Sequence, residues 1–357
     1  MGRTPMSGAL MRPAPMPASA PSWRRLPLLR FRLMAIRAAA ALLLAVSVCG
    51  ASAQSFGAEL GQINAALQAG EADHAIGLIA ALPQQGANLA EAQNLECRVR
   101  FTLQQWDAAA GECQQAVSLD SGNSNYHMWL GRALGERAGR ASFLTAFSLG
   151  KRVRAEFEAA VALDPRNAPA LSDLGDFYSE APGIVGGGLD KAENIAVQLD
   201  RISPARAHQL RAGIAEARKD DGTAERELKL AIQTSLHPAL QWTVLGSFYE
   251  HRRRWPEMED AIHNAASTAA KDRAAGVALY DGAGVLIRAQ RDPGLAARML
   301  QDYLAGDSKT EEAPAFIAHY RLARLLDQLG DSEGAQREQA AGYALAREYR
   351  PPQGGKS

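Results

Sequence analysis

The chain has 357 residues, of which 47% are hydrophobic, 22% charged and only 6% aromatic. These proportions exclude a collagen-like or wholly disordered chain, and they favour close-packed helices over β-sandwiches, which need aromatic and β-branched pairs. The net charge is zero, but residues 1–53 hold seven arginines and no other charged residue. Without that segment 32 basic residues face 39 acidic ones, and a net charge near −7 argues against nucleic-acid binding.

Residues 34–53 have the pattern of a cleavable signal peptide. Arg37 ends a short basic region, an apolar run follows over residues 38–48, and residues 51–53 (Ala-Ser-Ala) fit the small-residue cleavage site. The apolar run is too short to cross a bilayer, which takes about 20 residues. The sequence therefore predicts cleavage after Ala53 and a mature protein that begins at Gln54, in the periplasm or secreted.

The segment around the signal peptide leaves alternatives open. Residues 1–33 show no periodicity, and we expect them to be disordered or to precede the true start of translation at Met34. Cys49 follows a stretch that resembles a lipidation signal, although Val48 is larger than the residue that such a signal places there. We expect association with a membrane only if Cys49 is lipidated.

One position recurs along the rest of the chain and is usually occupied by a small residue. Its successive occurrences lie 34, 44, 39, 32, 34, 38 and 39 residues apart. They are Ala75, Ala109, Val153, Ala192, Ala224, Met258, Ala296 and Ala335. A base period of 34 residues, lengthened by insertions, is typical of tetratricopeptide repeats (TPR).

The residue pattern over residues 57–348 also resembles a TPR array. The fullest copy reads Trp242, Leu245, Gly246, Tyr249, Met258, Ile262 and Ala265. The resemblance implies two antiparallel helices per repeat, which approach closely at Gly131, Gly175, Gly246 and Gly284. The predicted fold is all-α: a right-handed α-solenoid of about seven to eight TPR-like helix hairpins over residues 54–349, followed by a disordered tail at 350–357.

Two repeats contain insertions. The third gains ten residues, Gly139–Ser148, which are apolar enough to lengthen both helices and pack together; a protruding finger that binds a partner is the alternative. The fourth contains Ala181-Pro182-Gly183 and a run of glycines before Lys191. This string is similar to an A-P-G-x-x-G-G-G-x-x-K-A insert in bacterial envelope TPR proteins. That similarity implies no catalytic role, and the absence of a following Gly-Lys-Ser/Thr favours a structural loop over a phosphate site.

Motifs for catalysis and for metal binding are missing from the sequence. Its seven histidines form no cluster with metal-ligand spacing, and no Gly-x-Ser-x-Gly element is present. We therefore expect no enzyme activity, no cofactor and no metal. Cys97 and Cys113 fall on facing helices of one repeat, where either a disulfide in an oxidising compartment or two buried free thiols fits the pattern.

The resemblance also implies a concave groove lined by the first helix of each repeat. The family's inward-facing positions correspond to Arg132, Glu136, Asp176, Glu180, Ser247, Glu250, Arg288, Tyr320 and Arg324. This mixed lining predicts a non-catalytic, exported scaffold that binds a protein or peptide in its groove. Two alternatives stay open: a membrane-tethered accessory factor for envelope or pilus assembly, and a structural protein that assembles with itself through its terminal repeats.

Overall fold

The structure is a computed structural model that describes residues 56–82 and 88–351. Contacts between residues divide the chain into two units, residues 1–58 and 59–357. Only residues 56–58 of the first unit are described, and they are helical. The predicted extension over 1–33, the predicted signal peptide over 34–53 and Cys49 therefore lie outside the described residues, as does most of the predicted tail.

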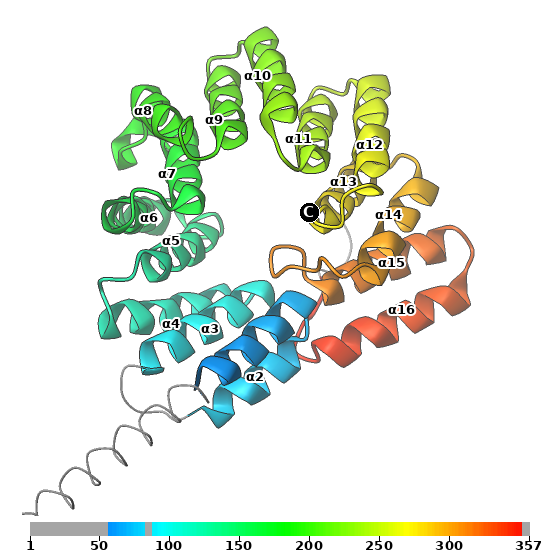
Figure 1. Cartoon of the computed structure of the whole chain (residues 1–357), viewed down its shortest axis with the longest axis horizontal. Coiled ribbons are helices and arrows are strands. Elements are labelled where there is room, and N and C mark those ends of the chain that lie inside the picture. The colour runs from blue at the N-terminus through cyan, green and yellow to red at the C-terminus, as the bar shows by residue number, and fades with distance from the viewer. Residues whose placement is uncertain (1–55, 83–87, 352–357) are drawn as a thin grey trace, which may run out of the picture. The chain divides into compact units, whose positions relative to one another are not determined.

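Helices follow one another in antiparallel pairs through the described part of the second unit (Figure 1). In the first pair, helical residues 59–69 precede α2 (Ala72–Ala81). The next pairs are α3 (Asn88–Thr102) with α4 (Trp106–Leu119), α5 (Ser124–Ala138) with α6 (Phe143–Leu163), and α7 (Ala168–Glu180) with α8 (Leu189–Leu199). The last four are α9 (Pro204–Ala217) with α10 (Asp221–Thr234), α11 (Pro238–His251) with α12 (Trp255–Ala269), α13 (Gly276–Ala289) with α14 (Pro293–Ala305), and α15 (Ala315–Gln328) with α16 (Ser332–Leu345). The predicted all-α solenoid of helical hairpins is confirmed.

The recurring small position marks the second helix of every pair. Each of its eight residues, from Ala75 in α2 to Ala335 in α16, lies in that helix. A side chain added at Gly131 would strike the ring of Phe157, and Leu210 and Ile262 occupy the corresponding space at Gly175 and Gly246. The predicted close approach within a pair is therefore confirmed at Gly131 and Gly246, whereas Gly175 is approached most closely by Leu210 of α9, in the next pair.

The fourth close approach is displaced by two residues. A Cβ atom at Gly284 would meet only the ends of two arginine side chains at 3.5 Å. The neighbouring small residue Gly282 instead faces Met299 of α14. The close approach between α13 and α14 thus lies at Gly282, where the end of the Met299 side chain fills the space beside the glycine.

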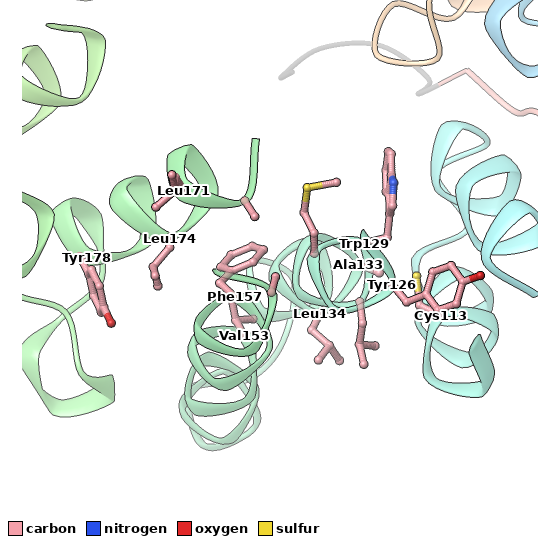
Figure 2. Close-up of a cluster of buried hydrophobic side chains, with 14 of the residues drawn as sticks. Cys113, Tyr126, Trp129, Ala133, Leu134, Val153, Phe157, Leu171, Leu174 and Tyr178 are labelled. Carbon is pink, nitrogen blue, oxygen red and sulfur yellow. The ribbon is translucent and has the colours of Figure 1, made fainter. Parts of the chain in front are cut away.

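Side chains of successive pairs share one core. Cys113, Trp129, Phe157, Leu171 and Leu174 belong to a single buried cluster that runs from α3 to α9 (Figure 2). A single hairpin cannot bury its apolar face on both sides, so each pair is stabilised by its neighbours.

The insertion in the third pair lengthens one helix only. Helix α6 has 21 residues and α5 has 15, so the expectation that both helices are extended is wrong. The insertion in the fourth pair forms the short 3₁₀ helix η1 (Gly183–Val185), which packs on α6 where Val185 meets Gly150. Gly186 has a positive φ of 103°, and its carbonyl oxygen accepts a hydrogen bond from Lys191 Nζ at 2.9 Å. These contacts give the glycines a structural role.

The two ends of the array contact each other. Helix α16 packs against α2, and a side chain built on Gly70, after the first helix, would come 2.5 Å from the backbone nitrogen of Ala315 at the start of α15. The carboxylate of Asp73 in α2 pairs with Arg347, just after α16, at 2.5 Å. The array is therefore closed by contacts between residues more than 240 positions apart.

Candidate functional site

The first helices of successive pairs contact one another in two runs. Consecutive members contact each other from α3 through α5 and α7 to α9, and α11 contacts α13. We call the surface of α3, α5, α7, α9, α11, α13 and α15 the inner wall. All nine predicted groove residues lie on these helices.

A cluster of charges surrounds Trp129 of α5. The guanidinium groups of Arg98 (α3) and Arg132 (α5) lie 5.8 and 4.9 Å from the centre of the indole ring. Arg132 donates to Asp173 of α7 at 2.6 Å. Burial raises the pKa of the Asp173 carboxyl, and the ion pair with Arg132 opposes that rise. Three neighbouring helices are thus joined by a partly buried network, which we call the Trp129 cluster.

A loop from the far end of the chain reaches the Trp129 cluster. Residues 306–314, between α14 and α15, are held in shape by the buried Tyr303, whose hydroxyl donates to the carbonyl of Ala313. Glu311 of this loop accepts two hydrogen bonds from Arg98, at 2.8 and 2.9 Å. The negative charge of the adjacent Glu312 contributes to raising the pKa of Arg132 and that of Asp281 in α13. The inner wall therefore already holds a non-helical segment of its own chain.

A polar pocket of about 250 Å³ lies beside the same cluster. Its lining comes from α3, from α5 and from the turn between α4 and α5: Glu91, Asn94, Arg98, Asn123, Asn125, Tyr126 and Trp129. Asn94 is buried, and its side-chain oxygen has no hydrogen-bond partner among the described residues. A buried acceptor without a donor is costly, and this oxygen is itself closed to solvent.

Asp176 of α7 is a second acid of the inner wall whose pKa is raised. Burial by the surrounding helices raises the pKa of its carboxyl to about 7, and the charges of Asp173 and Glu180 add to the rise. Arg206 of α9 opposes it. The side chain itself is open to solvent, so the surrounding helices restrict hydration of the carboxylate without covering it. Asp176 therefore changes its charge near neutral pH.

The opposite part of the inner wall carries further ion pairs. Arg288 of α13 donates to Glu250 of α11 at 2.8 Å, so the structure joins two of the predicted groove residues. Burial raises the pKa of Asp281 to about 6, although Arg321 opposes that shift. A second pocket, of about 330 Å³, lies between α13 and α15 and includes the predicted residue Arg324.

Three other predicted groove residues lie in different surroundings. Tyr320 packs against Tyr349, with ring centres 5.6 Å apart, so part of its face is covered by the C-terminal segment. Glu136, near the end of α5, pairs with Arg140 in the turn that follows. Ser247 is half-buried in α11. The remaining predicted residues lie near the Trp129 cluster or in the opposite part of the wall.

Sequence reasoning missed Arg98, Asn94 and Glu311. Arg98 follows Cys97 as Arg132 follows Gly131, so the repeat pattern, continued into the second repeat, would have placed Arg98 on the wall. Asn94 would have followed from the same alignment. Glu311 lies in a loop without repeat pattern, and no sequence signal brings it to α3.

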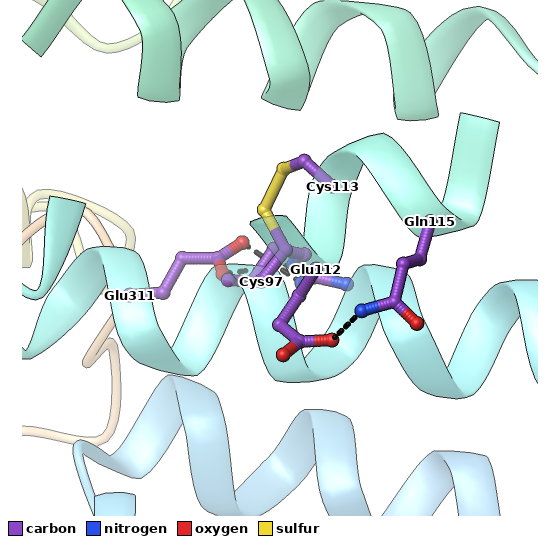
Figure 3. Close-up of a disulfide and its surroundings, with 6 residues drawn as sticks. Cys97, Glu112, Cys113, Gln115 and Glu311 are labelled. Atoms are coloured by element: carbon purple, nitrogen blue, oxygen red, sulfur yellow. Dashed lines mark hydrogen bonds and ion pairs between the residues drawn. A yellow bond between two sulfur atoms is a disulfide. The ribbon is translucent and has the colours of Figure 1, made fainter. Parts of the chain in front are cut away.

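A disulfide joins Cys97 of α3 to Cys113 of α4 (Figure 3). Their Cα atoms lie 5.1 Å apart, and the bond joins the two helices of one hairpin. Cys97 immediately precedes Arg98 in the sequence. Glu311, which is labelled in Figure 3, reaches this helix pair through Arg98. The link therefore fixes the helix pair to which the loop attaches.

Within residues 56–82 and 88–351, no group of three or more His, Cys, Asp or Glu side chains is arranged to hold a metal ion. In the same residues, no helix has both the length and the apolar character of a membrane span.

No model of a protein family and no curated protein matches the sequence. Many solved structures resemble it, among them the following three. A TPR protein of Thermus thermophilus, TTC0263, is 19% identical, with a TM-score of 0.41 over 56% of this chain and 99% of its own. The Cut9–Hcn1 hetero-tetramer of the APC/C is 13% identical, with a TM-score of 0.36 over 76% of this chain and 49% of the other.

The third structure is Pseudomonas aeruginosa PilF, which is 13% identical, with a TM-score of 0.34 over 73% of this chain and 94% of its own. Likeness at this level concerns the fold alone, and the partners of these proteins are not transferred to this chain.

Proposed function

We propose that this protein is an exported, non-catalytic scaffold whose inner wall binds a protein or peptide segment. The observation that carries the proposal is the docking of residues 306–314, in which Glu311 is held by Arg98. Because the inner wall binds a non-helical segment of its own chain, its shape and charges also suit a non-helical segment of a partner protein. The adjacent polar pocket, lined in part by Glu91, Asn123 and Asn125, offers such a segment polar side chains.

Mixed charge on the wall gives the binding its selectivity. Arg98 and Arg132 surround Trp129, whereas Asp176 and Glu180 lie on the neighbouring helix α7. Charged groups at an interface select partners and orient them, while aromatic side chains contribute most of the affinity. We expect the partner to contact the exposed Asn125 at the pocket beside the Trp129 cluster, and the exposed Asp176 to reject segments that place an acidic group beside it.

Two observations support export. The sequence of residues 34–53 has the pattern of a cleaved signal peptide, and a disulfide such as Cys97–Cys113 persists in oxidising compartments. Mass spectrometry of the protein purified from the envelope tests this proposal directly. A chain that begins at Gln54 supports export with cleavage, and a diacylated Cys49 supports the membrane-tethered alternative.

The closed array disfavours self-assembly through terminal repeats, because α16 already packs against α2. Site-specific photocrosslinking in cells tests the groove proposal without knowledge of the partner. A photoreactive residue at Arg324 or Glu180, on the inner wall, is expected to yield a crosslinked adduct. The same residue at the exposed Leu230 of α10, on a second helix, serves as the matched control. Adducts from Leu230 alone would show that the partner binds elsewhere.

A further inference from the structure

The first two turns of α6 protrude from the array. Helix α6 exceeds α5 by six residues, or about 9 Å at 1.5 Å per residue. The excess lies at the start of α6, because Ser124 at the start of α5 donates to the carbonyl of Ala160 near the end of α6, and Gly131 faces Phe157. We call residues 143–149 the α6 tip.

Large apolar side chains are exposed on the α6 tip. Phe143 and Leu144 are each 79% exposed. Ile184 of η1 is 66% exposed, and η1 lies against α6 at Gly150, about 9 Å along the helix axis from Leu144. Single exposed apolar residues are common on soluble proteins, but adjacent ones at a protruding helix end indicate an interaction site.

The neighbourhood of the tip is basic, although the body of the chain is acidic. Residues 137–155 contain five basic residues and no acidic one. Three of the five form ion pairs: Arg137 with Asp107, Arg140 with Glu136, and Arg154 with Glu158. The other two form no ion pair with any described residue. Lys151 lies over the ring of Phe147 at 4.3 Å, and Arg152 donates to the amide oxygen of Gln114.

We propose that the α6 tip, together with Ile184, docks this protein on an anionic lipid surface. Residues 141–150 carry no charge, and Lys151 lies about 12 Å along the helix axis from Phe143. Segments that bind at a membrane surface bury apolar side chains about 5–10 Å into the boundary between headgroups and acyl chains, and they keep Lys and Arg on the polar side. The α6 tip has the same order, with apolar residues at the end of the helix and Lys151 and Arg152 further along it.

Charge complementarity favours a lipid surface over a protein partner. The exposed Lys151 and Arg152, without ion-pair partners among the described residues, lie beside neutral, apolar residues. Basic residues near an anionic bilayer gain affinity from its negative surface potential. The docking is peripheral and needs neither a spanning helix nor a lipid on Cys49. It therefore differs from the expectation that membrane association requires lipidation of that cysteine.

Vesicle sedimentation with the full chain tests the proposal. The probes are vesicles of phosphatidylcholine alone and of phosphatidylcholine mixed with phosphatidylglycerol. We expect the double variant Phe143→Ser, Leu144→Ser to weaken binding to the mixed vesicles about fivefold or more, and Lys151→Glu, Arg152→Glu to weaken it similarly. The matched control is Leu236→Ser, because Leu236 is 92% exposed and lies far from the tip in sequence; this variant is expected to bind as the unaltered protein does.

A local fluorescence probe separates the tip from the apolar run over residues 38–48. Phe143→Trp in the full chain is expected to shift its emission to shorter wavelength on mixed vesicles and to be quenched by brominated lipid, whereas Leu236→Trp shows neither effect. Unchanged vesicle binding by the Phe143→Ser, Leu144→Ser variant, or no emission shift at position 143, would overturn the proposal. Loss of a protein partner by that variant, with vesicle binding unchanged, would instead assign the tip to a protein.

Discussion

Arg98 and Glu311 form a two-bond ion pair although 213 residues separate them in the sequence. Their side chains are only 12% and 11% exposed, so the pair is shielded from solvent on the inner wall. It links α3 of the second pair to the loop that precedes α15 of the last. Together with Asp73–Arg347, it converts an array that local packing would leave open into a closed one.

Loss of this pair should loosen the closure. We predict that Glu311→Ala lowers the free energy of unfolding by about 2 kcal/mol, because it leaves the partly buried Arg98 guanidinium without its carboxylate. Urea denaturation measures the change, and small-angle scattering should show a larger radius of gyration. The control is Arg337→Ala in the exposed Arg337–Glu333 pair, for which a change below about 0.5 kcal/mol is expected. Equal effects of the two substitutions would contradict a special role for Glu311.

The disulfide should stabilise the second pair. Its cysteines are 16 residues apart, and a link of that length restricts the unfolded chain by about 3 kcal/mol. We predict that a reducing agent lowers the melting temperature of the unaltered protein and leaves that of the Cys97→Ser, Cys113→Ser variant unchanged. Calorimetry with and without reductant measures both. If the melting temperature of the unaltered protein is the same with and without reductant, the disulfide does not contribute to stability.

Two glycines of α5 should respond to the same substitution in opposite directions. We predict that Gly131→Ala lowers the free energy of unfolding by about 2 kcal/mol, since the added methyl group strikes the ring of Phe157. Gly135→Ala meets no atom within 4 Å, and it should raise stability by about 0.5–1 kcal/mol through higher helix propensity. Combining Gly131→Ala with Phe157→Leu should recover part of the loss. Stabilisation by Gly131→Ala would refute the close packing of α5 on α6.

Stability should depend on pH through Asp176. The pKa of this carboxyl is raised to about 7 in the folded protein and is near 3.8 when unfolded, so the folded state holds the proton more tightly. Stability is therefore lost as the pH rises from about 4 through 7. We predict that Asp176→Asn removes this loss and is about 1 kcal/mol more stable than the unaltered protein at pH 8, a value reduced because solvent reaches the side chain. Urea denaturation of both proteins at pH 5 and pH 8 tests this prediction. If the variant and the unaltered protein differ in free energy of unfolding by the same amount at both pH values, the pKa of Asp176 is not raised.

The local fold was predictable because the repeat pattern encodes contacts between neighbouring helices. Gly131, Gly175 and Gly246 mark close approaches between neighbouring helices, and spacing along the chain is enough to find them. Closure was not predictable, since it depends on small rotations that accumulate over all pairs. The site was found in part for the same reason. Arg132 follows from its repeat position, whereas Glu311 belongs to a loop that the pattern does not describe.

The insertion in the third pair shows a second limit. The apolar residues Phe143 and Leu144 suggested two lengthened, mutually packed helices, but only α6 is extended and both side chains remain exposed. An apolar pattern predicts burial only where a partner surface is available. Composition alone does not distinguish a covered tip from one that contacts another molecule.

Crosslinking across the closure tests the central claim, that the two ends of this array meet and enclose the inner wall. Asp73→Cys and Arg347→Cys are introduced together, with Cys49 replaced by serine, and joined by a short bis-maleimide reagent. The closed array predicts an intramolecular crosslink between the two positions in the native protein and none in urea. The control pair of Asp73→Cys with Arg337→Cys, which lies two to three turns back along α16, should not crosslink. Absence of the Asp73–Arg347 crosslink under native conditions would contradict closure and the enclosed binding surface that depends on it.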